Sequence, residues 1–257
     1  MKRVWLWLAV LAVAAMAAPL LAPYAPDALD LANRRAAPSL AHWFGTDDLG
    51  RDAFSRALFG GRVSIAIGLL SALVAAGLGV SVGAVAGYVG GWTDTVLMRA
   101  TDAVLSVPRL LLLMVAAATL QPSVPALVVL VGAVGWMETA RVTRATVRSL
   151  LGAEFVLASR AVGAGHVRIL WRHLLANASG AIRTAAVLAV GRAILVESAL
   201  SFFGVGVQPP AASWGSMLYQ AQSAMTTEPW LALFPGACIV LTVGLLTAVS
   251  DRADQGR

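Results

Sequence analysis

The sequence predicts an all-α integral membrane protein that crosses the bilayer about six times. Of the 257 residues, 59% are hydrophobic and only 12% are charged. Soluble domains carry about a quarter charged residues, whereas the mean hydropathy here is +0.79. A helix needs about 20 apolar residues to cross a bilayer. The runs that approach or exceed this length are residues 4–21, 63–87, 97–120, 124–139, 178–203 and 230–249.

The first apolar run, residues 4–21, has two interpretations. Lys2 and Arg3 precede it, and small residues at 15–17 follow its apolar core, as in a secretory signal peptide. The same run also fits an uncleaved transmembrane helix. We expect the helix to be retained, because a protein with several spans gains from keeping it.

The second run, residues 63–87, is rich in glycine. Gly79, Gly83, Gly87 and Gly91 recur at four-residue spacing. Small residues on one stripe let helix backbones approach closely in lipid, where helices associate mainly through van der Waals contact. The stripe therefore predicts close helix packing.

Charge and proline interrupt the third run, residues 97–120. Asp102, Pro108 and Arg109 fall inside it. Because proline breaks or kinks a helix, we expect the first half to be an interfacial or kinked piece. The membrane span itself then begins near Leu110.

The fifth run, residues 178–203, carries Arg183, Arg192 and Glu197. Arg183 is near one end, where its long side chain can reach the interface. Arg192 and Glu197 lie deeper, where a lipid-facing charge is costly, so both should face protein or a water-filled cavity. Two roles remain open for them: an ion pair with a neighbouring helix, or a place along a translocation pathway.

Arginine placement predicts the orientation, because short cytoplasmic connections are enriched in Lys and Arg. With both termini in the cytoplasm, the connection between the fourth and fifth runs is cytoplasmic as well. The first external connection also carries arginines, but the 141–172 cluster is denser. That cluster comprises Arg141, Arg144, Arg148, Arg160, Arg168 and Arg172.

Residues 154–177 form a basic segment between two apolar runs. Val167, Leu170, Trp171 and Leu174 share one helical face, and Phe155, Ala158 and Val162 make a similar stripe before them. Glycines at 163 and 165 lie between the stripes, where glycine permits a tight turn. The pattern predicts two short helices on the membrane surface. The arginines of this segment would then face a soluble partner.

The residues provide no catalytic or metal-binding set. Lys2 is the only lysine, so a phosphate-binding loop that ends in Gly-Lys-Ser/Thr is excluded. His42, His166 and His173 are scattered, and Cys238 is alone. We therefore expect no enzyme activity and no cofactor. The net charge of +6 reflects basic residues between apolar spans, which favours a membrane protein over a nucleic-acid binder.

The 154–177 segment resembles the cytoplasmic loop of binding-protein-dependent ABC importer permeases. The family pattern is Glu-Ala-Ala, three residues, Gly, nine residues, then Ile-x-Leu-Pro. Ala158, Gly163 and Leu175 match it here. The positions that depart from it are Leu157, Ser159 and Ala176. Longer blocks at 44–65, 197–220 and 229–236 narrow the resemblance to the second permease subunit of the dipeptide/oligopeptide/nickel branch.

The resemblance implies the type I ABC importer permease architecture in a bacterial inner membrane. It divides the chain into an N-terminal helix with an extracytoplasmic segment (1–62), a permease domain (63–250) and a short cytoplasmic tail (251–257). The expected partners are a homologous second permease, two ATPase subunits, an extracytoplasmic solute-binding protein and membrane lipid. The residues expected to couple to the ATPases are Leu157, Ala158, Ser159, Gly163, Gly165, Arg168 and Leu175.

The substrate implied by the resemblance is a peptide or a related small solute such as a nickel chelate. A channel or secondary transporter without ATPases is the alternative that the residues leave open. Internal repeats or several membrane-buried acids would favour that alternative, and the sequence has no clear repeat.

Overall fold

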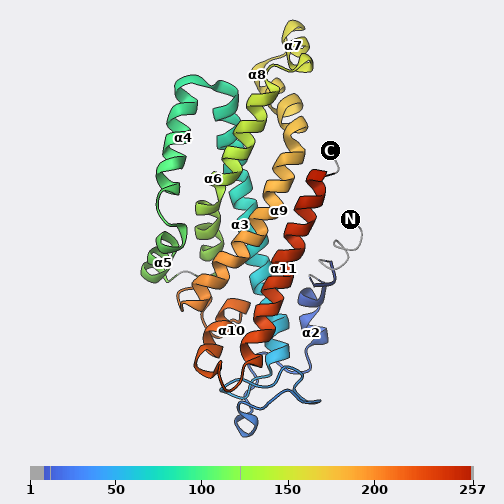
Figure 1. Ribbon diagram of the computed structural model, residues 1–257, viewed down its shortest axis with the longest axis vertical. Coiled ribbons are helices and arrows are strands. Elements are labelled where there is room, and N and C mark those ends of the chain that lie inside the picture. The colour runs from blue at the N-terminus through green and yellow to red at the C-terminus, as the bar shows by residue number, and fades with distance from the viewer. Residues whose placement is uncertain (1–8, 12, 122, 256–257) are drawn as a thin grey trace.

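The computed structural model describes residues 9–11, 13–121 and 123–255, and these residues are almost entirely helical. The long helices run side by side along one axis (Figure 1). Within the described residues the only bridge-type pairing is an isolated one between Thr46 and Asp52. The all-α fold class is confirmed.

The long helices follow the predicted apolar runs and extend beyond several of them. Within the described residues four helices are long and apolar enough to span a membrane, and the bent pair α4–α5 makes a fifth if it counts as one span. The first predicted run, 4–21, lies partly outside the described residues, which are helical at 9–11, 13–16 and in α2 (Ala18–Leu21). The remaining elements are η1 (Leu31–Asn33), α3 (Ala53–Val89), α4 (Gly91–Leu105), α5 (Arg109–Leu120), α6 (Val124–Leu150), α7 (Glu154–Ala161), α8 (His166–Arg168), the π-helical η2 (Ile169–Leu174), α9 (Leu175–Phe202), α10 (Trp214–Ala221), η3 (Gln222–Ala224) and α11 (Trp230–Gln255).

The closest helix pair is α3 and α6, and glycines make it possible. A Cβ added at Gly79 would lie 2.5 Å from the carbonyl oxygen of Trp136, and one at Gly87 would lie 2.8 Å from that of Arg144. Gly83 is equally tight, with Thr143 Cβ 2.9 Å away. The predicted packing stripe is therefore confirmed at these three positions. It is wrong at Gly91, which has open space around it because it begins α4 after a sharp turn.

The third predicted run is broken where the sequence placed the break. Pro108 is the N-cap of α5, and α4 and α5 meet at an angle of 75°. The kink is therefore confirmed. The turn between α3 and α4 is made by Gly90 and Gly91, whose φ angles are +69° and +55°, values that glycine adopts at little cost.

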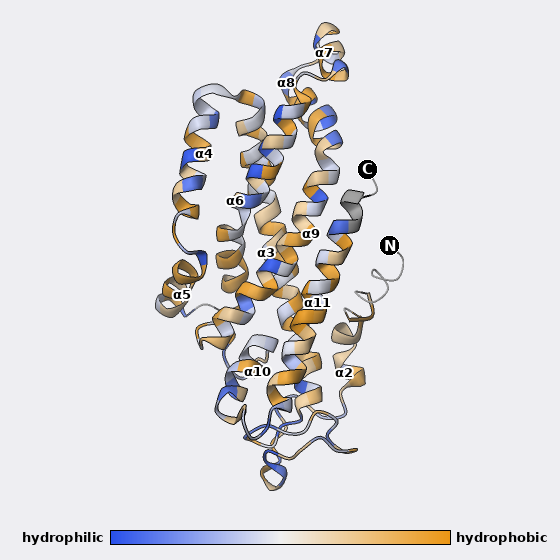
Figure 2. Cartoon of the chain, in the orientation of Figure 1, coloured by the Kyte–Doolittle hydropathy of each residue, from blue (hydrophilic) through white to orange (hydrophobic). Residues whose placement is uncertain are grey.

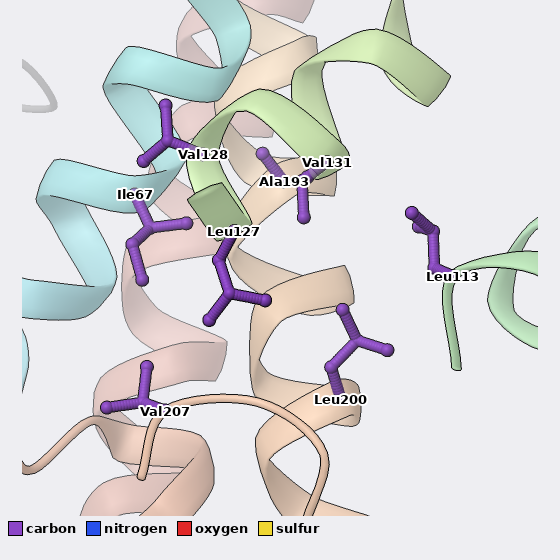
Figure 3. Close-up of a cluster of buried hydrophobic side chains, with 8 residues drawn as sticks. All are labelled: Ile67, Leu113, Leu127, Val128, Val131, Ala193, Leu200 and Val207. Atoms are coloured by element: carbon purple, nitrogen blue, oxygen red, sulfur yellow. The ribbon is translucent and has the colours of Figure 1, made fainter. Parts of the chain in front are cut away.

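A cluster of buried apolar side chains lies at the centre of the bundle and connects its helices. It draws on α3, α5, α6, α9 and the loop after α9, and Figure 3 shows Leu127 between side chains of its neighbours. Its members are Ile67, Leu113, Leu127, Val128, Val131, Ala193, Leu200 and Val207. The outer faces of the helices are also apolar (Figure 2), with exposed leucines and valines such as Leu73, Leu233 and Val240. This distribution is that of a bundle surrounded by lipid.

Residues 22–52 and α10 cover the end of the bundle opposite α7 (Figure 1). Two arginines at this end of the bundle are paired with Asp47: Arg51 Nε donates to Asp47 Oδ2 at 2.7 Å, and Arg56, which is buried in the first turn of α3, lies 3.6 Å from the same carboxylate. Gln220 of α10 accepts from both guanidinium groups. Asp30 begins η1, and the hydrogen bond from the Asn33 side chain lowers the pKa of its carboxyl. The positive charge of this connection is therefore largely neutralised.

Candidate functional site

The basic segment 154–177 stands at one end of the bundle, where Figure 1 shows α7 and α8 projecting beyond α6 and α9. Helix α7 ends at Ala161, and the chain reverses at Gly163, whose φ is +79°. The backbone N–H groups of Gly163 and Ala164 donate to Arg160 and Ser159 and close the turn. The predicted helical pieces on either side of a glycine turn are confirmed, but the second is not a short helix of its own, because from His166 it continues through η2 and α9 to Phe202.

The two apolar stripes predicted for this segment are wrong in register. Val162, Val167 and Trp171 are 85%, 73% and 65% exposed, whereas Ile169 and Leu174 are buried. The reason is that residues 169–174 are π-helical. A π-helix bonds residue i to i+5, so Ile169 and Leu174, five residues apart, share the inner face. The sequence reading assumed the α-helical period.

Buried contacts attach the segment to the two helices that pack most closely. Val156, Ile169 and Leu174 lie in one cluster with Ala84 of α3 and Val147 of α6. Tyr88 at the end of α3 adds a polar contact, because its hydroxyl lies 2.7 Å from Nδ1 of His166. A force on the segment is thus passed directly to α3 and α6.

The outward face of the segment combines apolar and basic side chains. Leu157 is 52% exposed, and Val162, Val167 and Trp171 are exposed with it. Arg160, Arg168 and Arg172 are exposed on the same segment. An apolar patch among positive charges suits a soluble partner with a complementary surface.

The predicted coupling residues divide into exposed and buried sets. Leu157, Ala158, Gly163, Gly165 and Arg168 are exposed, and Gly163 and Gly165 have open space where a Cβ would stand. The half-buried Ser159 donates its hydroxyl to the carbonyl of Phe155, one turn back on the same helix, at 2.7 Å. Leu175 is buried at the start of α9, so it can only support the segment from inside.

The two deep charges of α9 have different surroundings. Arg192 forms an ion pair with Glu138 of α6. Glu197 is 1% exposed and accepts from Ser64 Oγ of α3 at 2.9 Å and from Ser201 Oγ at 2.7 Å. Arg192 thus has the neighbouring-helix partner that one of the two open roles requires, while Glu197 is held by hydroxyl groups inside the bundle.

Sequence reading missed several charged contacts between helices. Asp94 of α4 accepts from Arg144 with both carboxylate oxygens and from Arg148 at 2.9 Å. Glu138 was counted within the fourth apolar run, and Arg109 only as a sign of a kink. A single acid within an apolar run was the available signal, but its partner could not be read from spacing within one helix.

The described residues contain no group of three or more His, Cys, Asp or Glu side chains that could hold a metal ion. The family model described as binding-protein-dependent transport system inner membrane component matches residues 79–255.

The chain belongs to this family.

Similarity to individual family members covers most of the chain. A protein of Brucella suis biovar 1 (strain 1330), provisionally named a peptide permease, is 40% identical over 91% of this chain and 78% of its own length. The oligopeptide transport system permease protein OppC of Bacillus subtilis (strain 168) is 38% identical over 92% of this chain and 78% of its own. The dipeptide transport system permease protein DppC of the same organism is 38% identical over 93% and 75%.

This binding-protein-dependent permease is thus a membrane-spanning subunit of an ATP-driven importer, an inner membrane component by family. ATP hydrolysis in the family is carried out by separate ATPase subunits. Its members work with a partner permease and a binding protein in general. The alternative of a channel or secondary transporter that works without ATPases is therefore set aside.

Proposed function

We propose that the chain forms half of the translocation pathway of an importer for peptides, together with a homologous second permease. The observation that carries the proposal is the similarity to oligopeptide and dipeptide permeases at 38% identity over more than nine-tenths of the chain. In the proposed assembly two ATPase subunits dock on one side of the membrane, and a solute-binding protein delivers the peptide from the other. The competing proposal is that the importer carries a nickel chelate, and the experiment below compares the two substrates.

The proposed orientation has both termini and the segment 154–177 in the cytoplasm. Residues 1–62 then comprise an N-terminal helix and an extracytoplasmic part, 63–250 the permease domain, and 251–257 a cytoplasmic tail. The density of arginines supports this orientation, because short cytoplasmic connections are enriched in Lys and Arg. Six arginines fall within residues 141–172: Arg141, Arg144, Arg148, Arg160, Arg168 and Arg172.

The proposed coupling mechanism works through the mixed outward face of the segment. Leu157, Ala158 and Arg168 would contact the ATPases, Gly163 and Gly165 would shape the turn, and Ser159 and Leu175 would hold the two helical pieces in place. Because Val156 and Leu174 pack against α3 and α6, closure of the ATPases would bias the bundle between its two states. Such a bias requires contacts that differ between those states.

The test is reconstitution of the chain with the second permease, the ATPases and the binding protein in proteoliposomes. We expect ATP-dependent uptake of a dipeptide or tripeptide and none of a nickel–histidine chelate. Arg168→Glu should reduce ATPase co-purification, whereas Arg183→Glu, the same change on α9 outside the segment, should leave it intact. Uptake of the chelate alone would overturn the proposed substrate, and normal docking of Arg168→Glu would overturn the proposed surface.

A further inference from the structure

Three charged side chains from three helices meet near the middle of the bundle. Arg192 of α9 is ion-paired with Glu138 of α6. Arg109, the first residue of α5, reaches the same place: its Nη2 would be 3.2 Å from a Cβ at Gly135, one turn before Glu138 on α6. Arg109 and Arg192 line the same shallow depression. We call these three side chains the central charge cluster.

The central charge cluster faces an open surface of this chain. The side chains of Arg192 and Glu138 are 37% and 40% exposed, although both belong to helices long and apolar enough to span a membrane. A charge facing lipid at this depth is costly. Apolar side chains are exposed elsewhere on the spans, as at Leu73 of α3 and Val240 of α11. The face that carries the cluster must therefore border water or another subunit.

The cluster holds more positive than negative charge. Arg109 and Arg192 contribute two guanidinium groups against the single carboxylate of Glu138. The shallow depression bordered by Arg109 and Arg192 is otherwise lined by Ser71, Gly135 and small apolar side chains, without an acid. Arg109 also keeps a buried Nε–H with no hydrogen-bond partner in the described part of the chain. The arrangement thus offers the positive charge of two guanidinium groups to an anion.

A carboxylate is the anion that such an arrangement recognises best. Guanidinium groups match carboxylates in shape and donate to them with two parallel N–H groups. Every unblocked peptide ends in a carboxylate that is ionised at neutral pH, since its pKa is about 3.3–3.7. An uncharged solute, such as a peptide whose carboxyl terminus is blocked and that carries no other charge, would have no carboxylate for the arginines to bind.

We infer that Arg109 and Arg192 bind the C-terminal carboxylate of the peptide as it passes, in competition with the Glu138 carboxylate that is ion-paired with Arg192. This inference rests on the proposed function, because it requires peptides to travel along this face. The cluster is a binding site within the pathway, and its net positive charge favours solutes with a free carboxyl terminus over those without one.

The experiment compares two substrates that differ only in that terminus. Uptake of trialanine and of trialanine amide is measured in proteoliposomes with the complete importer and its binding protein. For each variant, the ratio of acid uptake to amide uptake is divided by the wild-type ratio, so that the preference of the unchanged binding protein cancels. Stimulation of ATP hydrolysis by the loaded binding protein checks that each variant assembles.

We expect Arg109→Gln and Arg192→Gln to lower this ratio at least about tenfold, the effect of losing a charge-assisted hydrogen bond. Glu138→Gln removes the anion and should leave the ratio unchanged or raise it. Arg109→Lys keeps the charge and should retain most of the preference. Arg99→Gln, at an exposed arginine of α4, is the control and should have no effect.

The Glu138→Gln variant separates carboxylate binding from a structural role. If the arginines bind the carboxylate, the acid-to-amide ratio stays unchanged or rises, and a fall in this ratio contradicts the inference. If neutralising any of the three residues lowers uptake of the acid and the amide equally, the cluster is a contact within the assembly, for instance with the second permease. That result overturns the inference and leaves peptide import intact. If the wild-type importer takes up neither peptide while it takes up another solute, the proposed function fails and the inference fails with it.

Discussion

Gly163 is the residue on which the shape of the basic segment depends. Its φ of +79° lies in the left-handed region, which a β-branched residue adopts only at a cost of about 1–3 kcal/mol. Space is not the constraint, because nothing lies within 4 Å of an added Cβ. Any effect of a substitution there must come from the backbone.

We therefore expect Gly163→Val to leave the subunit inserted and abundant but to uncouple ATP hydrolysis from uptake, or to lose the ATPases. Gly152→Val is the matched control, since Gly152 also has open space around it but no positive φ. The measurements are ATPase pull-down and transport. Normal docking and uptake by Gly163→Val would show that the turn is not part of the coupling element.

Glu197 organises the opposite end of the bundle from inside. The two hydroxyls that donate to it also accept from the backbone: Ser64 Oγ from the N–H of Trp214 at 3.2 Å, and Ser201 Oγ from that of Val207 at 3.0 Å. One carboxylate thus fixes the direction of two hydroxyls, which in turn hold α10 and the loop before it.

Replacing Glu197 with alanine should lower the thermal stability of the purified subunit. Two buried hydroxyls lose their acceptor, at about 1–3 kcal/mol for each unsatisfied group. Thr139→Val is the control, because Thr139 Oγ1 is buried on α6 without a hydrogen-bond partner in the described structure and valine keeps the shape of the side chain. Equal melting temperatures for Glu197→Ala and Thr139→Val would contradict this account of the network.

At the scale of the elements, helix positions and the break at Pro108 could be predicted because both depend on local sequence. Apolar runs and a proline act within one helix. The π-helical stretch could not be predicted, since nothing in the spacing of residues 169–174 distinguishes a period of five from one of four. The inward positions of Ile169 and Leu174 were missed for this reason.

Contacts between residues of different helices also could not be predicted from the sequence. The central charge cluster and the Asp94 ion pairs join residues from separate helices, so their partners depend on how the helices pack. The candidate coupling segment was found because all its residues are consecutive. Its exposed and buried faces were assigned only by the structure, which places Leu175 inside and Leu157 outside.

Asp94 should act as the clamp that holds α4 against α6. Its side chain is 7% exposed and is bonded by Arg144 and Arg148. Asp94→Asn should destabilise the subunit by about 1.5–3 kcal/mol, the range for hydrogen bonds to charged groups. Asp102→Asn is the comparison, because the Asp102–Arg141 pair is more than half exposed and should contribute about 1 kcal/mol or less. Thermal unfolding in detergent would detect the difference, and a larger effect at Asp102 would refute the clamp.

At the scale of the whole molecule, the two ends of the bundle should lie on opposite sides of the membrane. Leu40 and Val162 are 98% and 85% exposed and belong to the 22–52 cover and the basic segment. In a Cys238→Ala background, a cysteine at Leu40 should react with an impermeant thiol reagent added outside intact cells. A cysteine at Val162 should react only after the membrane is opened. The reverse pattern would invert the proposed orientation.

The glycine contacts between α3 and α6 also limit how the molecule can move. Their backbones touch over several turns, as at Gly79 and Gly87, so one helix cannot slide or tilt without colliding with the other. Helices α3 and α6 must therefore move together as one rigid unit, and the basic segment is attached to one end of this unit. Any opening between subunits must then be absorbed by parts that can flex, such as the 75° joint between α4 and α5 and the proline inside α11 at Pro235. In mechanical terms, we expect the pair to act as a lever of the importer and these two interruptions to act as its hinges.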